Sequence, residues 1–213
     1  ALDNASGTAA LMEIARAYAA LPQAPRRSVL FLSVTAEEQG LLGSLYYAAN
    51  PPFPLQNTVG GLNMDGMNNF GATRDITVVG LGMSDLDDYL AAAAAAQERV
   101  VEGDREAEKG YYYRSDHFEL AKEGVPMLYP SGGYDDREKG VAYGMEKANE
   151  YTEDHYHRVS DEYDLSWDVS GAMEDMEMYF KTGLDVANSD DWPNWKEGTE
   201  FKATRDAQMA GSK

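Results

Sequence analysis

The sequence predicts a three-layer α/β/α sandwich built on a mostly parallel, mixed sheet. Short apolar runs that suit buried strands alternate along the chain with longer segments that suit helices. Two of those runs end in carboxylates, and parallel sheets form their sites at the carboxyl ends of their strands. Neither an internal repeat nor a linker is visible, so we expect a single domain over residues 1–213.

In the first half of the chain, helical and strand patterns alternate. Residues 5–21 place apolar side chains on one face at helical spacing, and Pro22 ends the pattern. The nearly continuous apolar run 29–34 suits a strand that is buried on both faces. The predicted elements that follow are a helix over 41–49 and strands over 58–64 and 75–79.

The second half is predicted to begin with a helix, whose N-terminus is marked by Ser84 and Asp85. Residues 132–160 are polar and read as irregular structure, as does the tail from Ser189. The remaining predictions are a helix over 86–101, a loop over 102–114, a short helix over 116–122, a strand over 126–129 and a long helix over 169–188.

Composition and charge narrow the range of partners. Acidic residues outnumber basic ones 37 to 18, giving a formal net charge of −19. We expect no nucleic-acid partner and no anionic membrane partner, because phosphate binding requires clustered Lys and Arg. The longest uniformly apolar stretch, the alanine run 91–96, is too short to span a membrane. The chain has no cysteine, which excludes disulfides and thiolate metal sites.

Carboxylates stand at three positions where they could face a cleft. Asp3 lies at the head of the first predicted helix, where an N-cap role would also explain it. The pair Glu37 and Glu38 follows an apolar strand directly, so one carboxylate could bind a metal while the other moves a proton; a surface pair at a loop start is the alternative. Asp65 ends another strand, where it is either a ligand or part of an Asx turn.

The three histidines of the chain lie outside apolar faces, which argues against core positions. They are His117, in Ser-Asp-His, and the pair His155 and His157. In an extended segment the latter two would point the same way, and spacing does not decide which of them binds a metal. Asp, Glu and His without Cys are ligands for zinc or a similar divalent ion. Such a set can hold two ions roughly 3.5–4 Å apart if one aspartate bridges them.

These residues resemble the motifs of the M28 metallopeptidases, the co-catalytic zinc aminopeptidases of the bacterial leucyl aminopeptidase type. The resemblance covers essentially the whole chain, and its strength comes from five short motifs in the same order. The motifs are Asp-Asn-Ala-Ser-Gly (3–7), Ala-Glu-Glu-Gln-Gly (36–40), Asn-Met-Asp (63–65), Arg-Ser-Asp-His (114–117) and Tyr-His (156–157) followed by Asp161.

The resemblance implies a metal site with one base. Asp3 matches the aspartate that bridges two zinc ions, Glu38 a ligand of one ion and Asp65 a ligand of the other. His157 matches the last ligand, on the ion shared with Glu38. Glu37 matches the general base that activates the water between the ions.

Further residues are assigned to the surroundings of that site. Tyr112, with Tyr113 close behind, lies where some members place a tyrosine against the developing oxyanion. Asp116 and His117 would lie beside the ligands or contact the substrate. Asp161 could orient His157 as a carboxylate partner of a metal-bound histidine, or cap the following segment.

The chain departs from the family pattern at its start. The first ligand of the family is a histidine in a His-x-Asp motif, which would lie upstream of Asp3 and is not in this sequence. We therefore expect an N-terminally incomplete peptidase domain that lacks several strands and holds one or two zinc ions. Possible partners are the missing N-terminal segment and the protease-associated domain that related bacterial members carry upstream.

The function expected from this resemblance is removal of the N-terminal residue from peptides. Secretion or a periplasmic location in a bacterium is expected by resemblance alone. Two alternatives stay open: another zinc amide hydrolase on the same scaffold, such as a carboxypeptidase or a cyclase-like enzyme, and a catalytically inactive binding module.

Overall fold

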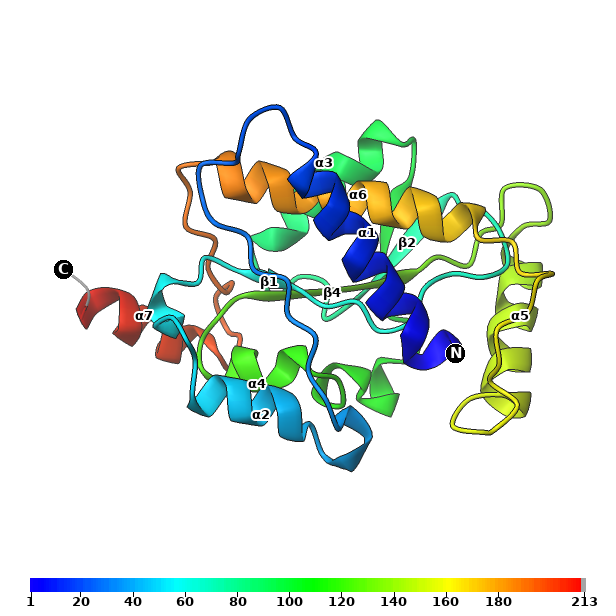
Figure 1. Ribbon diagram of the computed structural model, residues 1–213, viewed down its shortest axis with the longest axis horizontal. Helices are drawn as coiled ribbons and strands as arrows, with labels where there is room; N and C mark the ends of the chain where they lie inside the picture. Colours follow the sequence, from blue (N-terminus) through cyan, green and yellow to red (C-terminus); the bar gives the residue numbers. More distant parts are fainter. Residues whose placement is uncertain (212–213) are drawn as a thin grey trace.

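A mixed four-stranded sheet lies at the centre of the computed structural model, which describes residues 1–211 (Figure 1). The strands are β1 (Gly61–Leu62), β2 (Asp75–Val79), β3 (Val100–Gly103) and β4 (Met127–Gly132), in the order β1-β4-β2-β3. β1 runs parallel to β4 and β2 parallel to β3, whereas β2 and β4 are antiparallel. Three layers with a mixed sheet agree with the predicted fold class.

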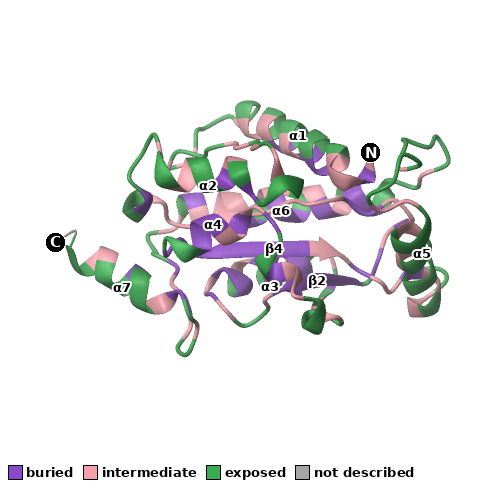
Figure 2. Ribbon diagram, turned by 90° about the horizontal axis from the view of Figure 1, so that it is seen from below, coloured by how far each residue is buried: buried purple, intermediate pink, exposed green. Residues whose placement is uncertain are grey.

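Helices cover both faces of this sheet. One face carries α1 (Gly7–Ala19), α3 (Leu86–Ala96) and α6 (Ser170–Asn188), and the other carries α2 (Leu42–Ala49) and α4 (His117–Lys122) (Figure 1). Two helices project from opposite ends of the molecule and are largely exposed, namely α5 (Val141–Asp154) and α7 (Lys202–Gly211) (Figure 2).

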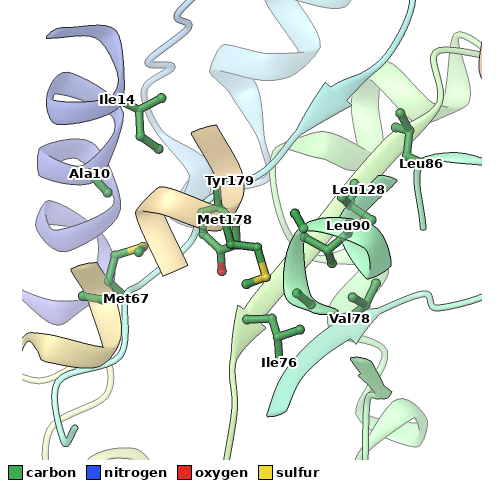
Figure 3. Close-up of a cluster of buried hydrophobic side chains, with 13 residues drawn as sticks. Ala10, Ile14, Met67, Ile76, Val78, Leu86, Leu90, Leu128, Met178 and Tyr179 are labelled. Carbon is green, nitrogen blue, oxygen red and sulfur yellow. The ribbon is translucent and has the colours of Figure 1, made fainter. Parts of the chain in front are cut away.

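The larger core lies between the sheet and the layer of α1, α3 and α6 (Figure 3). Ile76 and Val78 project from β2 toward Leu90 of α3 and Met178 of α6, and all four side chains are buried. Every residue of β2 is buried, as expected of a central strand that is covered on both faces. The sheet is thereby fixed against three helices by burial of apolar area, the main stabilising term in folding.

A second apolar cluster covers the opposite face. Trp195, from the segment after α6, is buried there and donates its Nε1–H to the carbonyl of Gly124 at 3.0 Å. Phe201 packs against Trp195 and Tyr112. The irregular tail is anchored by these aromatic contacts.

A buried ion pair joins the sheet to the helix layer that contains α6. Arg99, just before β3, approaches Asp175 of α6 with Nη1 and Oδ1 2.7 Å apart, and both side chains are at most 1% exposed. The Arg99 guanidinium also donates to the hydroxyl of Thr73 and the carbonyl of Asp75. These contacts tie the start of β3 to α6.

Two strand predictions differ from the structure. Residues 29–34 are extended but form no strand among the described residues, and Val29 and Leu30 are 37% and 54% exposed. Residues 58–64 contain a strand, but it is reduced to β1 and is only half-buried. Both differences have the same physical reason. A strand forms by pairing with a neighbouring strand, and within the described chain β1 has a neighbour on one side only.

One helix prediction and two predictions of irregular structure also need correction. The helix predicted over 86–101 ends at Ala96, and residues 100–103 form β3, because Glu98 adopts a positive φ of 57° that breaks the helix. Part of the segment 132–160 forms α5, and part of the tail forms α7. Both segments are rich in polar and charged residues and bury little side-chain surface, which is why they read as irregular structure.

The other predicted helices agree with the structure within a few residues, as do the strands β2 and β4. None of the helices in residues 1–211 combines the length and apolar character needed to cross a bilayer.

Candidate metal centre

Three of the expected ligands meet at one end of the molecule. One ligand atom each from Asp3, Glu38 and His157 lies within 4.8 Å of the others. The Nε2 atom of His157 is 3.0 Å from Oε1 of Glu38 and 3.4 Å from Oδ2 of Asp3. His157 lies more than a hundred positions from Asp3 and Glu38 in the sequence, so the tertiary fold alone brings it to them.

Each of the three ligand residues lies in a turn of the backbone. Asp3 lies in a kinked turn before α1, where the Ser6 hydroxyl donates to the Leu2 carbonyl at 2.6 Å. Residues 37–39 form a single 3₁₀ turn between Ala36 and Gly40, which both have positive φ. His157 lies in the turn after α5, also at positive φ.

Asp65 lies beside this group and is held by hydroxyls. Its Oδ2 accepts hydrogen bonds from Ser115 Oγ at 2.8 Å and from Tyr129 Oη at 3.3 Å. The amide of Asn63 donates to the same serine oxygen at 2.8 Å. Asp65 stays outside the three-residue cluster, but it is close enough for its charge to act on Asp3 and Glu37.

The electrostatics of this end of the molecule favour a cation. Partial burial, followed by the charges of Asp65 and Glu38, raises the pKa of Asp3 to about 6. Burial and the charges of Asp65, Glu38 and Asp116 raise the pKa of Glu37 to about 7. Several carboxylates thus repel one another in a partly desolvated space, and a divalent ion would relieve that repulsion. Carboxylates and an imidazole without thiolates fit zinc in donor type.

The family of the chain follows from a comparison of its sequence with known families. The model described as Peptidase family M28 matches residues 1–181. The chain belongs to peptidase family M28. The matched range contains every residue of the metal cluster.

Similar proteins agree with this membership. A probable zinc metalloprotease from Leptosphaeria maculans is 43% identical over 63 residues, which are 30% of this chain and 14% of that protein. The Legionella pneumophila LapA aminopeptidase has a TM-score of 0.64 at 22% identity, over 90% of this chain and 47% of that chain. An aminopeptidase from Aneurinibacillus sp. strain AM-1 has a TM-score of 0.62 at 20% identity, over 89% and 40%. The chain thus has the aminopeptidase fold and spans less than half of these solved structures.

In this M28 chain, Asp161 supports Asp3 rather than His157. Its carboxylate accepts the backbone N–H of Leu2 at 2.9 Å and that of Asp3 at 3.1 Å, and Tyr151 donates its hydroxyl to the same group. In this structure the Asp161 carboxylate thus contacts the backbone at the start of the chain rather than His157.

Replacing Asp161 by Asn should weaken zinc binding by about 10- to 100-fold, the usual loss when a supporting partner of a ligand is changed. The amide replaces a charged acceptor with a neutral one and offers an N–H toward backbone donors, so the Asp3 segment loses its anchor. Competitive titration with a zinc indicator measures the affinity. Asp164→Asn is the matched control, because the Asp164 carboxylate is exposed and binds Ser166 instead. Equal affinity in the two variants would contradict the role given to Asp161.

Three residues that were predicted to surround the ligands have different environments in the structure. Tyr112 is 6% exposed and packs with Phe201 and His117 in the second apolar cluster, so the structure does not bring it to the metal cluster. Tyr113 is exposed and donates its hydroxyl to Glu200 at 3.0 Å. Asp116 remains near Glu37, whose pKa its charge helps to raise.

His117 is a core residue, contrary to the sequence-based expectation. It is 1% exposed and lies between the rings of Tyr112 and Tyr129, with centroids 4.6 and 4.8 Å away. Burial lowers the pKa of His117 to about 3, so the ring is neutral. His155, which directly follows α5, is also separate from the ligands. Its Nδ1 faces the carbonyl and hydroxyl oxygens of Ser160.

Sequence reasoning missed three residues that shape the centre. Tyr156 stacks on His157 with centroids 3.8 Å apart, and Ser115 and Tyr129 hold Asp65. Burial, followed by the charge of Asp3, raises the pKa of Tyr156 to about 12. Its position directly before His157 was the available signal, whereas Tyr129 gave none.

Without metal, the protein should lose stability as the pH rises from about 4 to 7, the range between the ordinary and the raised pKa values of Asp3 and Glu37. The pKa values of Asp3 and Glu37 are raised by folding, so the folded state binds protons that the unfolded chain releases, and ionisation of these groups favours unfolding. Each pKa unit corresponds to about 1.4 kcal/mol, and partial exposure reduces the expected sum to about 2–3 kcal/mol.

Thermal denaturation in the presence of a chelator, recorded across this pH range, measures the effect. In the double variant Asp3→Asn with Glu37→Gln, the melting temperature should change less with pH. Zinc added to the wild type should reverse the loss of stability. A melting temperature that rises with pH in the metal-free wild type would contradict the assignment.

Proposed function

We propose that this chain supplies the metal-binding and catalytic residues of a zinc-dependent aminopeptidase, which removes the N-terminal residue of a peptide. The observation that carries the proposal is the convergence of Asp3, Glu38 and His157, with Glu37 beside them as a carboxylate of raised pKa. Membership of peptidase family M28 supports the reaction class, and the aminopeptidase fold of the solved neighbours supports the exopeptidase.

Asp3, Glu38 and His157 would hold one zinc ion, and Asp3 with Asp65 would contribute to a second site. When bound, zinc polarises the scissile carbonyl and makes a water more acidic. Glu37 is not needed as a ligand, so its carboxylate is free to accept the proton of the attacking water and deliver it to the leaving amine. A raised pKa suits that task, because the group must both take and release a proton near neutral pH.

The surrounding carboxylates also support recognition of a free peptide N-terminus. Asp65, Asp116 and the ligand carboxylates form a negative site that would attract the α-ammonium group of a substrate. A peptide is thus the proposed partner, with no nucleic acid or membrane, and a secreted or periplasmic location fits a degradative exopeptidase.

A peptide panel tests the proposal against its alternatives. The longest natural form of the protein is loaded with zinc and given three peptides of one sequence, with a free N-terminus, an acetylated N-terminus and an amidated C-terminus. An aminopeptidase cleaves the first and third and spares the second. Loss of cleavage only on C-terminal amidation would favour a carboxypeptidase, and no hydrolysis with bound zinc would favour a binding module.

A further inference from the structure

The imidazole of His157 is oriented toward the other ligands, but no hydrogen bond fixes its second ring nitrogen. Its Nε2 atom lies 3.0 Å from Glu38 and 3.4 Å from Asp3. Among residues 1–211, no protein group forms a hydrogen bond with its Nδ1. A metal-bound histidine ordinarily donates this second N–H to a carboxylate, a backbone carbonyl or water, which fixes the orientation of the ring. No protein acceptor does so here, although the side chain of His157 is 43% exposed.

The ring of Tyr156 lies against that imidazole instead. The two ring centroids are 3.8 Å apart and the ring planes are inclined by 30°, which is a stacked arrangement. His157 adopts a positive φ of 57°, a backbone conformation that is uncommon and unfavourable for a residue with a side chain. Such a conformation persists where the surrounding structure maintains it, and it is frequent at functional sites.

The end of α5 holds Tyr156 in its turn. The backbone N–H of Tyr156 donates to the carbonyl of Tyr151 at 2.9 Å, and the centroids of these two rings are 6.1 Å apart. The Tyr151 hydroxyl donates to Oδ2 of Asp161 at 3.2 Å, and the same carboxylate accepts the backbone N–H of Asp3. The largely exposed helix α5 (Figure 2) thus supports two ligand segments, His157 through stacked rings and Asp3 through Asp161.

A stacked phenol also suits an imidazole that binds a metal. The face of an aromatic ring carries negative charge density and attracts a positively charged partner above it. A divalent ion withdraws electron density from the imidazole that binds it, so the stack is more favourable in the metal-bound state than in the metal-free state. A contact that is stronger in one state shifts the equilibrium toward that state.

We propose that Tyr156 is a positioning residue of the metal centre, which holds the imidazole of His157 by ring stacking in place of a hydrogen-bonded protein acceptor. The phenol ring is the part that acts, and its hydroxyl group is not required. The inference rests on the proposed zinc centre, because it takes His157 to be a ligand, but it does not rest on the peptidase reaction.

The zinc affinities of Tyr156 variants separate the ring from its hydroxyl. Tyr156→Ala should weaken zinc binding by about 10- to 100-fold, the usual loss when a group that supports a metal ligand is removed. Tyr156→Leu keeps an apolar side chain without a flat ring and should be equally weak. Tyr156→Phe keeps the ring and should stay within about threefold of wild type. Competitive titration with a zinc indicator gives the affinities, and thermal denaturation with a chelator shows which variants are folded.

Tyr163→Ala is the matched control for these variants. Tyr163 lies in the same segment between α5 and α6, is 66% exposed and packs on Trp167, so zinc affinity should not change. A Tyr156→Phe protein that binds zinc as weakly as Tyr156→Leu would overturn the proposal, because the hydroxyl and not the ring would then act. Wild-type affinity in Tyr156→Leu would overturn it as well.

Proton NMR of the metal-free protein detects the stack without any assay of activity. The ring protons of His157 should resonate upfield of ordinary imidazole protons in the wild type and in Tyr156→Phe, because they lie over an aromatic face. In Tyr156→Leu they should return to ordinary positions. The chain has three histidines, so the spectrum of His157→Gln assigns these signals. Ordinary positions in the wild type would contradict the stack.

The same His157→Gln protein separates failure of this inference from failure of the proposed centre. If it binds zinc as tightly as wild type, His157 is not a ligand and the centre itself is wrong. If it loses zinc while Tyr156→Ala and Tyr156→Leu keep it, the centre stands and the positioning role of Tyr156 is wrong.

Discussion

Replacing Glu37 by Gln is expected to lower kcat by about 10²–10⁴-fold, the usual contribution of a positioned general base. Glutamine has the same shape but cannot accept the proton of the attacking water near neutral pH. Asp3, Glu38 and His157 remain in place, so the zinc affinity should stay within about twofold of wild type. Steady-state hydrolysis of a peptide with a free N-terminus gives kcat, and a zinc competition assay gives the affinity.

The neighbouring residues provide sharp controls for this variant. Glu38→Gln removes a ligand 3.0 Å from His157, so it should lower zinc affinity together with turnover. Glu102→Gln changes an exposed glutamate of β3 and should leave both quantities unchanged. If Glu37→Gln loses zinc as severely as Glu38→Gln, Glu37 is a ligand and the assignment of the base is wrong.

Breaking the buried pair of Arg99 and Asp175 should cost about 3–5 kcal/mol of folding stability. In Arg99→Met the Asp175 carboxylate remains in an apolar surrounding without its cation, and the groups at Thr73 and Asp75 lose their donor. For a domain of this length the cost corresponds to a melting temperature lower by roughly 6–20 °C. Urea denaturation and differential scanning calorimetry measure these two quantities.

The double variant Arg99→Met with Asp175→Leu separates an unpaired charge from lost packing. Because both charges are then absent, much of the stability should return. Lys181→Ala removes an exposed i,i+4 pair with Asp185 on the same helix and should change stability by at most about 0.5 kcal/mol. An Arg99→Met protein as stable as Lys181→Ala would contradict the importance of the buried pair.

The predicted fold was most accurate where a segment buries a regular apolar pattern. β2 and α6 agree with their predicted ranges because their side chains enter the core, and core residues leave a period in the sequence. Residues 29–34 carry the same pattern, yet they form no strand in the described chain, because a strand is completed by its neighbour and not by its own side chains. α5 and α7 were missed because their segments are rich in polar and charged residues and bury little side-chain surface.

The candidate site was likewise predicted only in part from the sequence. Asp3, Glu38 and His157 could be named because the short motifs around them resemble those of the M28 metallopeptidases, whereas spacing alone did not decide between His155 and His157. The environment of each histidine could not be read in this way. His117 lies in a polar motif, but the helix that begins there turns its ring between two tyrosines of the core.

The sequence by itself determined the α/β class, the acidic character and the residue types available for a metal, because these depend on composition and local period. Tertiary structure alone decided that Asp3, Glu38 and His157 share one point in space, that Asp161 supports Asp3, and that Tyr112 is buried away from them. The physical reason is that distances between remote segments are set by packing of the whole core, which no single stretch of sequence contains.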